Sequence, residues 1–244
     1  METSQAQASS LKSQASSLKP QVSSLPPEEL LEWAARKYPG RIALASSLGP
    51  EDQALLHMIA SRQLPIPVFT LDTGRLFEES YTLLDETRER YGLDIRVFCP
   101  ESGEVEEMVR EHGVNLFRTS VELRKQCCAV RKVHPLRRAL SGLEAWIVGL
   151  RREQSPTRDA LEPLAWDEPN ELFKLAPLHD WTEARLWEYL KENDVPVNAL
   201  HAQGFPSIGC ACCTRAVRPG ENARDGRWWW ENPMQRECGL HVHR

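Results

Sequence analysis

Residues 41–52 read Arg41-Ile42-Ala43-Leu44-Ala45-Ser46-Ser47-Leu48-Gly49-Pro50-Glu51-Asp52. A short apolar segment comes first, small polar residues follow, and a proline then opens a segment that begins with acidic residues. A short apolar run bounded by turn residues is typical of a buried strand, and proline followed by acidic residues is typical of a first helical turn. The stretch therefore predicts a strand over 41–45, a loop and a helix over 51–61, which is the repeating unit of a parallel α/β fold.

The same alternation continues along the chain. Further strands are expected over 67–71, 94–98, 145–149 and 172–175. Further helices are expected over 28–37, 77–91, 105–112, 130–140 and 182–193. Short strands that alternate with longer helices predict an open, mainly parallel sheet with crossover helices.

Length and charge exclude several classes of protein. The chain has 244 residues and a net charge of -5, which suits one large domain and is too mild to imply nucleic-acid binding. No apolar run approaches membrane-spanning length, and the N-terminus lacks a hydrophobic signal core. We expect a soluble, cytoplasmic protein of a reducing compartment that binds neither nucleic acid nor membrane.

Three regions differ in composition. Residues 1–27 are rich in Ser, Gln, Ala and Lys, and we expect them to be disordered because they have few large apolar groups. Residues 28–206 carry the α/β pattern of a nucleotide-binding domain. Residues 207–244 contain scattered Gly and Pro, several arginines and the triplet Trp228-Trp229-Trp230. A segment of this length without regular patterning is uncommon unless it is functional, so we expect a cysteine-bearing segment followed by an irregular, mobile tail.

Polar motifs follow the predicted strands at the edge where parallel sheets bind ligands. Residues 46–49 follow the first strand and residues 72–75 the second, while Arg151, Arg152 and Arg158 come after the fourth. Backbone N–H groups at a helix start and guanidinium groups both bind phosphate or sulfate oxygens. Each motif alone is an ordinary loop or solvated charge run, but together they predict a site for a phosphorylated or sulfated small molecule. The chain has neither a Walker A loop nor a dinucleotide-binding glycine fingerprint.

Five of the seven cysteines fall into two tight groups, the pair Cys127-Cys128 and the set Cys210, Cys212 and Cys213. Grouped thiolates bind zinc, Cu(I) or iron–sulfur clusters. Zinc sites usually leave a short gap between paired cysteines, whereas neighbouring thiols can each bind a different iron atom of a cluster. We therefore favour an iron–sulfur cluster over zinc at these two groups.

Cys238 stands apart from both groups, in the terminal sequence Glu237-Cys238-Gly239-Leu240-His241. A lone cysteine is often an inert surface thiol. The nearby Arg236, His243 and Arg244 make this neighbourhood cationic, which favours the thiolate. Thiolate attack on a sulfur centre, followed by resolution with another thiol, is established chemistry for such a group.

Taken together, these motifs resemble the assimilatory adenylyl-sulfate reductases of the PAPS reductase family. The resemblance covers about residues 28–244 and rests on the two cysteine groups, the turn Leu71-Asp72-Thr73-Gly74-Arg75, residues 224–231 and the terminal motif around Cys238. It implies an adenine nucleotide alpha-hydrolase-like fold of PP-loop type. It also implies a 4Fe–4S cluster on Cys127, Cys128, Cys210 and Cys213.

The resemblance further implies an activity in sulfate assimilation and cysteine biosynthesis. Cys238 would attack the sulfur of adenosine 5′-phosphosulfate, release AMP and become an S-sulfocysteine, from which thioredoxin or glutaredoxin would free sulfite. The cluster would support substrate binding and activation rather than deliver the two electrons. A homo-oligomer is compatible with this scheme. One alternative is a reductase that prefers the 3′-phosphorylated nucleotide or accepts both, and an alternative of another class is a zinc-binding interaction module.

The substrate residues are expected in several segments. They are Ser46, Ser47, Gly49, Leu71, Thr73, Gly74, Lys132, Gly149, Arg158, Arg224, Arg227 and His241. The family commonly has proline between the last two ligand cysteines, whereas this chain has Cys212 there. Cys210 and Cys213 keep the two-residue gap, so we expect them to be the ligands and Cys212 to be a competitor or a bystander.

Overall fold

The computed structural model describes residues 15–155 and 158–232. Within them, six strands form one sheet in the order β3-β2-β1-β4-β6-β5. The strands are β1 (Ile42–Ser46), β2 (Val68–Leu71), β3 (Ile95–Phe98), β4 (Ala145–Val148), β5 (Leu164–Asp167) and β6 (Leu172–Leu175). Strand β4 pairs in parallel with β1 and β6, and β5 pairs antiparallel with β6 at the edge. The predicted open, mainly parallel sheet is confirmed.

The antiparallel edge strand β5 was not expected from the sequence. It pairs with β6 residue by residue, from Leu164 opposite Leu175 to Asp167 opposite Leu172. Its Asp167 forms a buried ion pair with Lys174 of β6, at 3.6 Å. The charge of Asp167 interrupts the short apolar pattern by which β5 could have been recognised.

The described helices from α2 onward include one that the sequence did not predict. They are α2 (Pro27–Lys37), α3 (Pro50–Ser61), α4 (Glu78–Tyr91), α5 (Ser102–His112), α6 (Val121–Cys128), α7 (His134–Leu140) and α8 (Glu183–Glu192). Helix α6 is the unexpected one, and Ser120 caps its start by accepting a hydrogen bond from the backbone N–H of Leu123. A π-helical turn, η2 (Ala129–Val133), joins α6 to α7 where one helix over 130–140 was expected. The pair Cys127-Cys128 therefore lies at the end of a helix, directly before a π-helical turn of the kind often found at functional sites.

Residues 15–22 are helical, although disorder was expected up to residue 27. Ala15, Leu18 and Val22 are buried. Their spacing places them on one face of a helix, so this short segment buries apolar surface that composition alone does not reveal. Residues 1–14 lie outside the described part of the chain.

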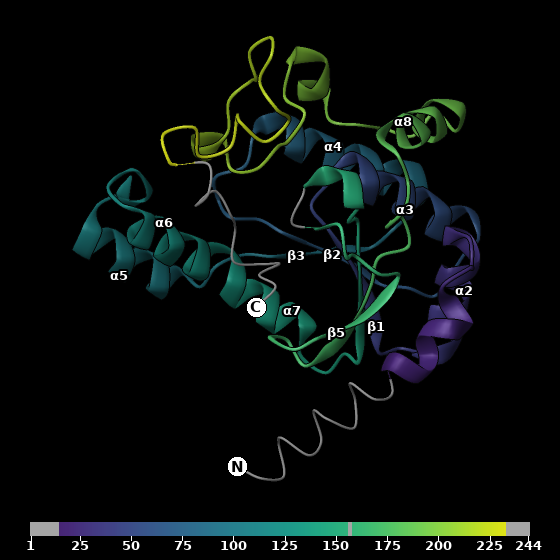
Figure 1. Cartoon of the computed structure of the whole chain (residues 1–244). Helices are drawn as coiled ribbons and strands as arrows, with labels where there is room; N and C mark the ends of the chain where they lie inside the picture. The colour runs from purple at the N-terminus through teal and green to yellow at the C-terminus, as the bar shows by residue number, and fades with distance from the viewer. Residues whose placement is uncertain (1–14, 156–157, 233–244) are drawn as a thin grey trace. The chain divides into compact units, whose positions relative to one another are not determined.

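The described residues divide into two compact units. The first unit contains those up to residue 69 together with 87–95 and 140–196. Its core includes the fully buried Ile42, Leu44, Ala145 and Ile147 of strands β1 and β4. Helix α3 contacts both α2 and α8, as Figure 1 shows.

The second unit contains residues 70–86, 96–139 and 197–232 of the described chain. In this unit, α5 contacts the π-helical turn η2 that follows α6. Its apolar core combines Phe117 and Trp228 with three buried cysteines, Cys127, Cys210 and Cys213. No helix of the described residues has both the length and the apolar character needed to cross a membrane.

Candidate functional site

The loop at residues 46–49, in the first unit, is held by hydrogen bonds between near neighbours. The Ser46 hydroxyl accepts from the backbone N–H of Leu48 (3.1 Å), whose φ of 61° is in the left-handed region. The backbone N–H and hydroxyl of Ser47 both donate to Oδ2 of Asp52, at 2.6 and 2.7 Å. Gly49 is the N-cap of α3. The loop thus has a defined conformation next to a helix N-terminus, where anions are favoured.

Asp52 links this loop to the end of β4. Burial raises the pKa of its carboxyl to about 6, although hydrogen bonds from Ser47 lower it. A Cβ atom on Gly149 would lie 2.2 Å from Oδ1 of Asp52 and 2.9 Å from Cβ of Glu51. Because no side chain fits at that distance, a glycine is required at position 149. The structure therefore brings Ser47 and Gly149 to the same carboxylate, a connection that the sequence did not predict.

Arg151 has a different role from the one expected. Its side chain is buried, and its Nε donates to Oε1 of Glu51 at 2.8 Å. Another of its N–H groups donates to the carbonyl of Trp181 at 3.3 Å. These hydrogen bonds connect the segment after β4 to the start of α3, so the guanidinium of Arg151 binds protein groups and not a ligand. Arg158 is also in the first unit, where its guanidinium donates to the side chain of Gln154.

The turn after β2 belongs to the second unit. Gly74 has a φ of 67°, and its N–H donates to Oδ1 of Asp72 at 2.7 Å. The carbonyl of Thr73 accepts from Nη1 of Arg131 at 2.7 Å. The Thr73 hydroxyl lies 3.3 Å from Sγ of Cys210. Leu71, Thr73 and Gly74 therefore lie on a tight turn that contacts a cysteine 137 residues away in the sequence.

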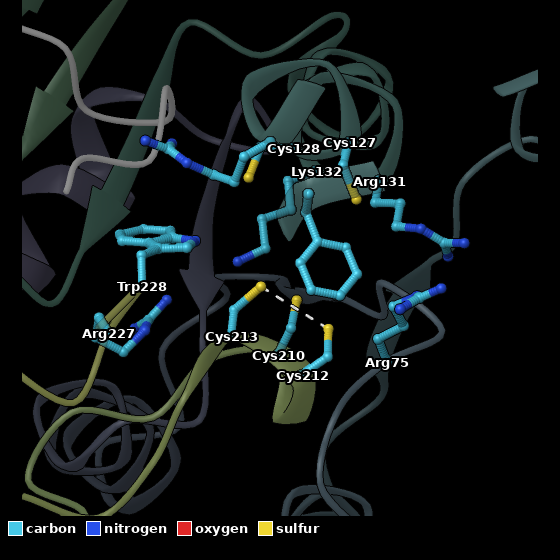
Figure 2. A pocket seen from close by; sticks show the side chains of 12 residues that line it. Arg75, Cys127, Cys128, Arg131, Lys132, Cys210, Cys212, Cys213, Arg227 and Trp228 are labelled. Atoms are coloured by element: carbon cyan, nitrogen blue, oxygen red, sulfur yellow. Dashed lines mark hydrogen bonds between the residues drawn. The ribbon is translucent and has the colours of Figure 1, made fainter. Parts of the chain in front are cut away.

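One pocket of the second unit collects the grouped cysteines, as Figure 2 shows. Cys127 and Cys128 come from the end of α6, while Cys210, Cys212 and Cys213 come from the short turn η6 (Ala211–Cys213) and the residue before it. Cys127, Cys210 and Cys213 are buried, and the other two are half-buried. The four expected ligands thus line the same pocket, together with the unexpected fifth thiol.

Cations surround these thiols. The pocket is also lined by Arg75, Arg124, Arg131, Lys132 and Arg227. Lys132 extends from η2, one turn after Cys128, and is labelled among the sulfurs in Figure 2. This concentration of positive charge stabilises thiolates in the pocket and favours binding of an anionic ligand.

The buried thiols differ in their pKa values. Burial raises the pKa of Cys127, although Arg131 lowers it. The hydrogen bond with Cys212, at 3.8 Å between the sulfurs, and burial both raise the pKa of Cys213. The same contact, together with a hydrogen bond from Arg75, lowers the pKa of Cys212. Several thiolates buried together are unfavourable unless a metal centre supplies positive charge.

The donor set fits an iron–sulfur cluster. Two segments supply soft thiol ligands, and each thiol would bind a separate iron atom. Among the described residues, no three His, Cys, Asp or Glu side chains lie close enough together to hold a single metal ion. The buried indole N–H of Trp228 has no hydrogen-bond acceptor within the described part of the chain. Figure 2 shows this nitrogen on the side of the ring that faces the cysteines, where it suits a sulfur acceptor.

Arg227 fixes the loop that leads to Cys210. Its Nη1 donates to the carbonyl of Ile208 (3.2 Å) and approaches the hydroxyl of Ser207 (3.4 Å). A Cβ on Gly209 would lie 2.2 Å from Nη2 of Arg227, so a larger residue there would displace this guanidinium. The backbone N–H of Arg227 donates to the carbonyl of Arg224 at 2.9 Å, which places the two expected substrate arginines on one turn.

An ion pair between Arg124 and Glu231 lies beside the cysteines and was not found from the sequence. Nε of Arg124 donates to Oε1 of Glu231 at 3.0 Å and Nη2 donates to Oε2 at 2.8 Å. The two side chains are 0% and 4% exposed. Burial lowers the pKa of the Arg124 guanidinium, but Glu231 and Cys128 more than offset this, so that the pKa is raised. The only sequence signal is an arginine one helical turn before Cys128.

The expected nucleophile Cys238 and its neighbour His241 lie outside the described residues.

The chain is similar to known proteins over most of its length. A family model described as the phosphoadenosine phosphosulfate reductase domain matches residues 41–216. The adenosine 5′-phosphosulfate reductase of Burkholderia cepacia is 54% identical over 202 residues, which are 83% of this chain and 81% of the relative. The protein of the same name from Allochromatium vinosum is 48% identical over 213 residues, which are 87% of this chain and 83% of the relative.

Solved structures agree with these sequence matches. The crystal structure of phosphoadenylyl-sulfate (PAPS) reductase from Candida auris, a phosphate complex, has a TM-score of 0.72 at 28% identity and covers 83% of this chain and 96% of that one. Candida glabrata FMN adenylyltransferase in complex with FMN and an ATP analogue has a TM-score of 0.54 at 20% identity and covers 80% of this chain and 67% of that one. The second match shows a shared fold alone. The adenine nucleotide alpha-hydrolase-like fold expected from the resemblance is confirmed.

Proposed function

The chain belongs to the phosphoadenosine phosphosulfate reductase family, and from this membership we propose that it reduces adenosine 5′-phosphosulfate to sulfite and AMP with thioredoxin or glutaredoxin as the reductant. The observation that supports this proposal most strongly is that Cys127, Cys128, Cys210 and Cys213 line the same basic pocket. Relatives about half identical to this chain bear the name of the 5′-phosphosulfate enzyme, which favours that nucleotide over its 3′-phosphorylated form.

Cys238 performs the group transfer in this proposal. Its thiolate attacks the sulfate sulfur, the bond from that sulfur to the bridging oxygen breaks, and AMP leaves with the electron pair. A reductant thiolate then attacks the Sγ of the S-sulfocysteine, and sulfite leaves with the electron pair of the broken S–S bond. A second reductant thiol resolves the mixed disulfide, so the two thiols of the reductant supply both electrons.

The remaining expected residues bind and orient the nucleotide. The N–H groups at the start of α3 and the Ser46–Gly49 loop suit an anionic group of the substrate. Lys132, Arg224 and Arg227 are cations that stabilise the negative charge that develops on the bridging oxygen as AMP departs. Arg158 and His241 are assigned to the same substrate by the family resemblance.

Cys127, Cys128, Cys210 and Cys213 would hold a 4Fe–4S cluster. When bound, this group would support substrate binding and activation, and it would not deliver the two transferred electrons. Trp228 offers an indole N–H, and Thr73 a hydroxyl, to sulfur atoms of this site.

Replacing Cys238 with serine tests the nucleophile directly. We expect Cys238→Ser to lose sulfite release completely while iron and acid-labile sulfide stay at the wild-type level, because Cys238 is not one of the four expected cluster ligands. Cys99→Ser is the matched control, since Cys99 is an exposed thiol outside the pocket, and it is expected to keep full activity. Turnover by Cys238→Ser would contradict the assignment.

Competition between the two nucleotides tests the substrate. With both present in a sulfite-release assay, we expect the 5′-phosphosulfate to be consumed first. Preferential use of the 3′-phosphorylated nucleotide would establish the alternative specificity. A colourless protein with stoichiometric zinc and no sulfide would contradict the cluster and favour the interaction module.

A further inference from the structure

We propose that Arg124 and Glu231 are positioning residues that hold the two cysteine segments of the pocket in register with one another, so that the cluster is retained. The inference rests on the proposed function, because it assumes that the pocket binds a cluster. It assigns a role to a charged pair that neither the sequence motifs nor the expected ligand set includes.

The geometry of the pair is typical of a fixed contact. Both side chains are almost completely buried, and two parallel hydrogen bonds of 3.0 and 2.8 Å join the guanidinium to the carboxylate. A bidentate contact fixes the orientation of both groups. A buried ion pair contributes little net stability, but either charge left alone would be strongly unfavourable. We therefore infer that the ion pair mainly fixes the positions of neighbouring residues and adds little to the free energy of unfolding.

Arg124 reaches the first cysteine segment. It lies on α6, four residues before Cys128, and residues at this spacing share one face of a helix. The guanidinium interacts with the Cys128 thiol as well as with Glu231. A fixed guanidinium beside this sulfur sets the orientation of the thiol and offers it a hydrogen bond.

Trp228 carries the connection to the second segment. Its indole ring is buried and lies 4.8 Å from the guanidinium carbon of Arg124 and 4.8 Å from that of Arg227. Its backbone N–H donates to the carbonyl of Cys213 at 3.1 Å, although its φ of 43° is unusual for a residue other than glycine. The N–H of Glu231 donates to the carbonyl of Trp228 at 2.8 Å. The residues from Trp228 to Glu231 therefore form one turn, fixed at one end to Cys213 and at the other to Arg124.

The consequence is a link between Cys128 and Cys213 that consists of protein contacts. Removal of the Glu231 charge would leave Arg124 as a buried cation, which would turn away and release both the Trp228 ring and the Cys128 thiol. The thiols would remain present, but the distance between the two segments would no longer be held. A cluster bound to such a site is expected to dissociate faster.

The test uses Glu231→Gln and Arg124→Lys in the full chain, purified without oxygen. We expect iron release to a chelator to be about tenfold faster in both variants, since loss of a group that orients a metal ligand weakens metal binding by this order. The double variant should be no faster than the faster single variant, because the two residues act as a unit. The visible absorption of the cluster should also shift in both variants. A role in overall stability alone would not change this absorption.

Glu221→Gln is the matched control. Glu221 also forms a bidentate pair, with Arg215 at 2.7 and 2.8 Å, but this pair is partly exposed and does not line the cysteine pocket. We expect its iron release to stay within about twofold of wild type. Glu231→Asp, which keeps the charge, should release iron more slowly than Glu231→Gln, and it provides the comparison if the amide variant does not fold.

The outcomes separate the two levels of the proposal. If wild type binds iron and forms the Cys238 adduct while Glu231→Gln and Arg124→Lys release iron at the rate of Glu221→Gln, the positioning role is refuted and the proposed function stands. If wild type itself contains no iron and forms no adduct, the proposed function fails and this inference fails with it.

Discussion

The loop at residues 46–49 and the cysteine pocket are held by contacts of very different range. Ser47 bonds to a carboxylate five residues away, whereas Arg124 bonds to one 107 residues away and Thr73 contacts a sulfur 137 residues away. The loop follows from its local sequence and from the fold of the first unit. The pocket requires several distant segments of the second unit to meet, and its buried thiols need a cation. We therefore expect the pocket, and not the loop, to depend on a bound metal.

The largest effect is expected from removal of a single pocket thiol. Cys213→Ser should purify without iron and acid-labile sulfide, because a buried ligand that keeps the two-residue gap to Cys210 is lost. Cys212→Ala should keep both, since its thiol is the additional one. Iron and sulfide determination after anaerobic purification measures the difference. If Cys212→Ala lost iron and sulfide while Cys213→Ser kept them, Cys212 and not Cys213 would be the ligand.

A smaller effect is expected in the first unit from Gly149→Ala. The new methyl group would overlap Oδ1 of Asp52, so we expect a loss of about 1–3 kcal/mol in the free energy of unfolding and a raised KM for the nucleotide. Iron content should not change. Gly103→Ala is the control, because a Cβ at position 103 meets no atom within 4 Å. Urea unfolding checks both, and equal stability of the two variants would contradict the tight approach of Gly149 to Asp52.

The smallest effect is a dependence of stability on pH. Burial raises the pKa of Asp52 from 3.8 to about 6 in the folded protein, so the folded state holds this proton more tightly than the unfolded state. The protonated carboxyl therefore contributes stability at low pH, and this contribution is lost as the pH rises through about 6. The stability of Asp52→Asn relative to wild type should increase by roughly 1.4 kcal/mol as the pH is raised from about 5 to 7.5. A difference between the two proteins that does not change with pH would show that Asp52 ionises normally.

Local patterns predicted most of the strands and helices. The strands over 41–45, 67–71, 94–98, 145–149 and 172–175 were expected within one residue of their observed ends, because each is a short apolar run bounded by turn residues. Helix α3 was expected from proline and acidic residues at its start. Strand β5 was missed because a buried ion pair replaces its apolar alternation, and α6 because its sequence lacks a strong apolar stripe.

In the second unit, the sequence predicted which thiols are functional but not the contacts that surround them. Cysteine spacing and family resemblance selected the thiols, and the structure places those that it describes around one pocket. The pairing of Arg124 with Glu231, and the fit of Gly209 against Arg227, depend on residues far apart in the sequence. Neither contact has a local pattern, so a single sequence offers no means of finding them.

Mass spectrometry of the peptide that carries Cys238 tests the central claim most directly. After the protein is incubated with adenosine 5′-phosphosulfate and no reductant, we expect this peptide to gain the mass of one sulfo group, which thioredoxin then removes as sulfite. The pocket cysteines should stay unmodified. Accumulation of sulfite on addition of reductant, with no modified Cys238 peptide detected beforehand, would contradict the account.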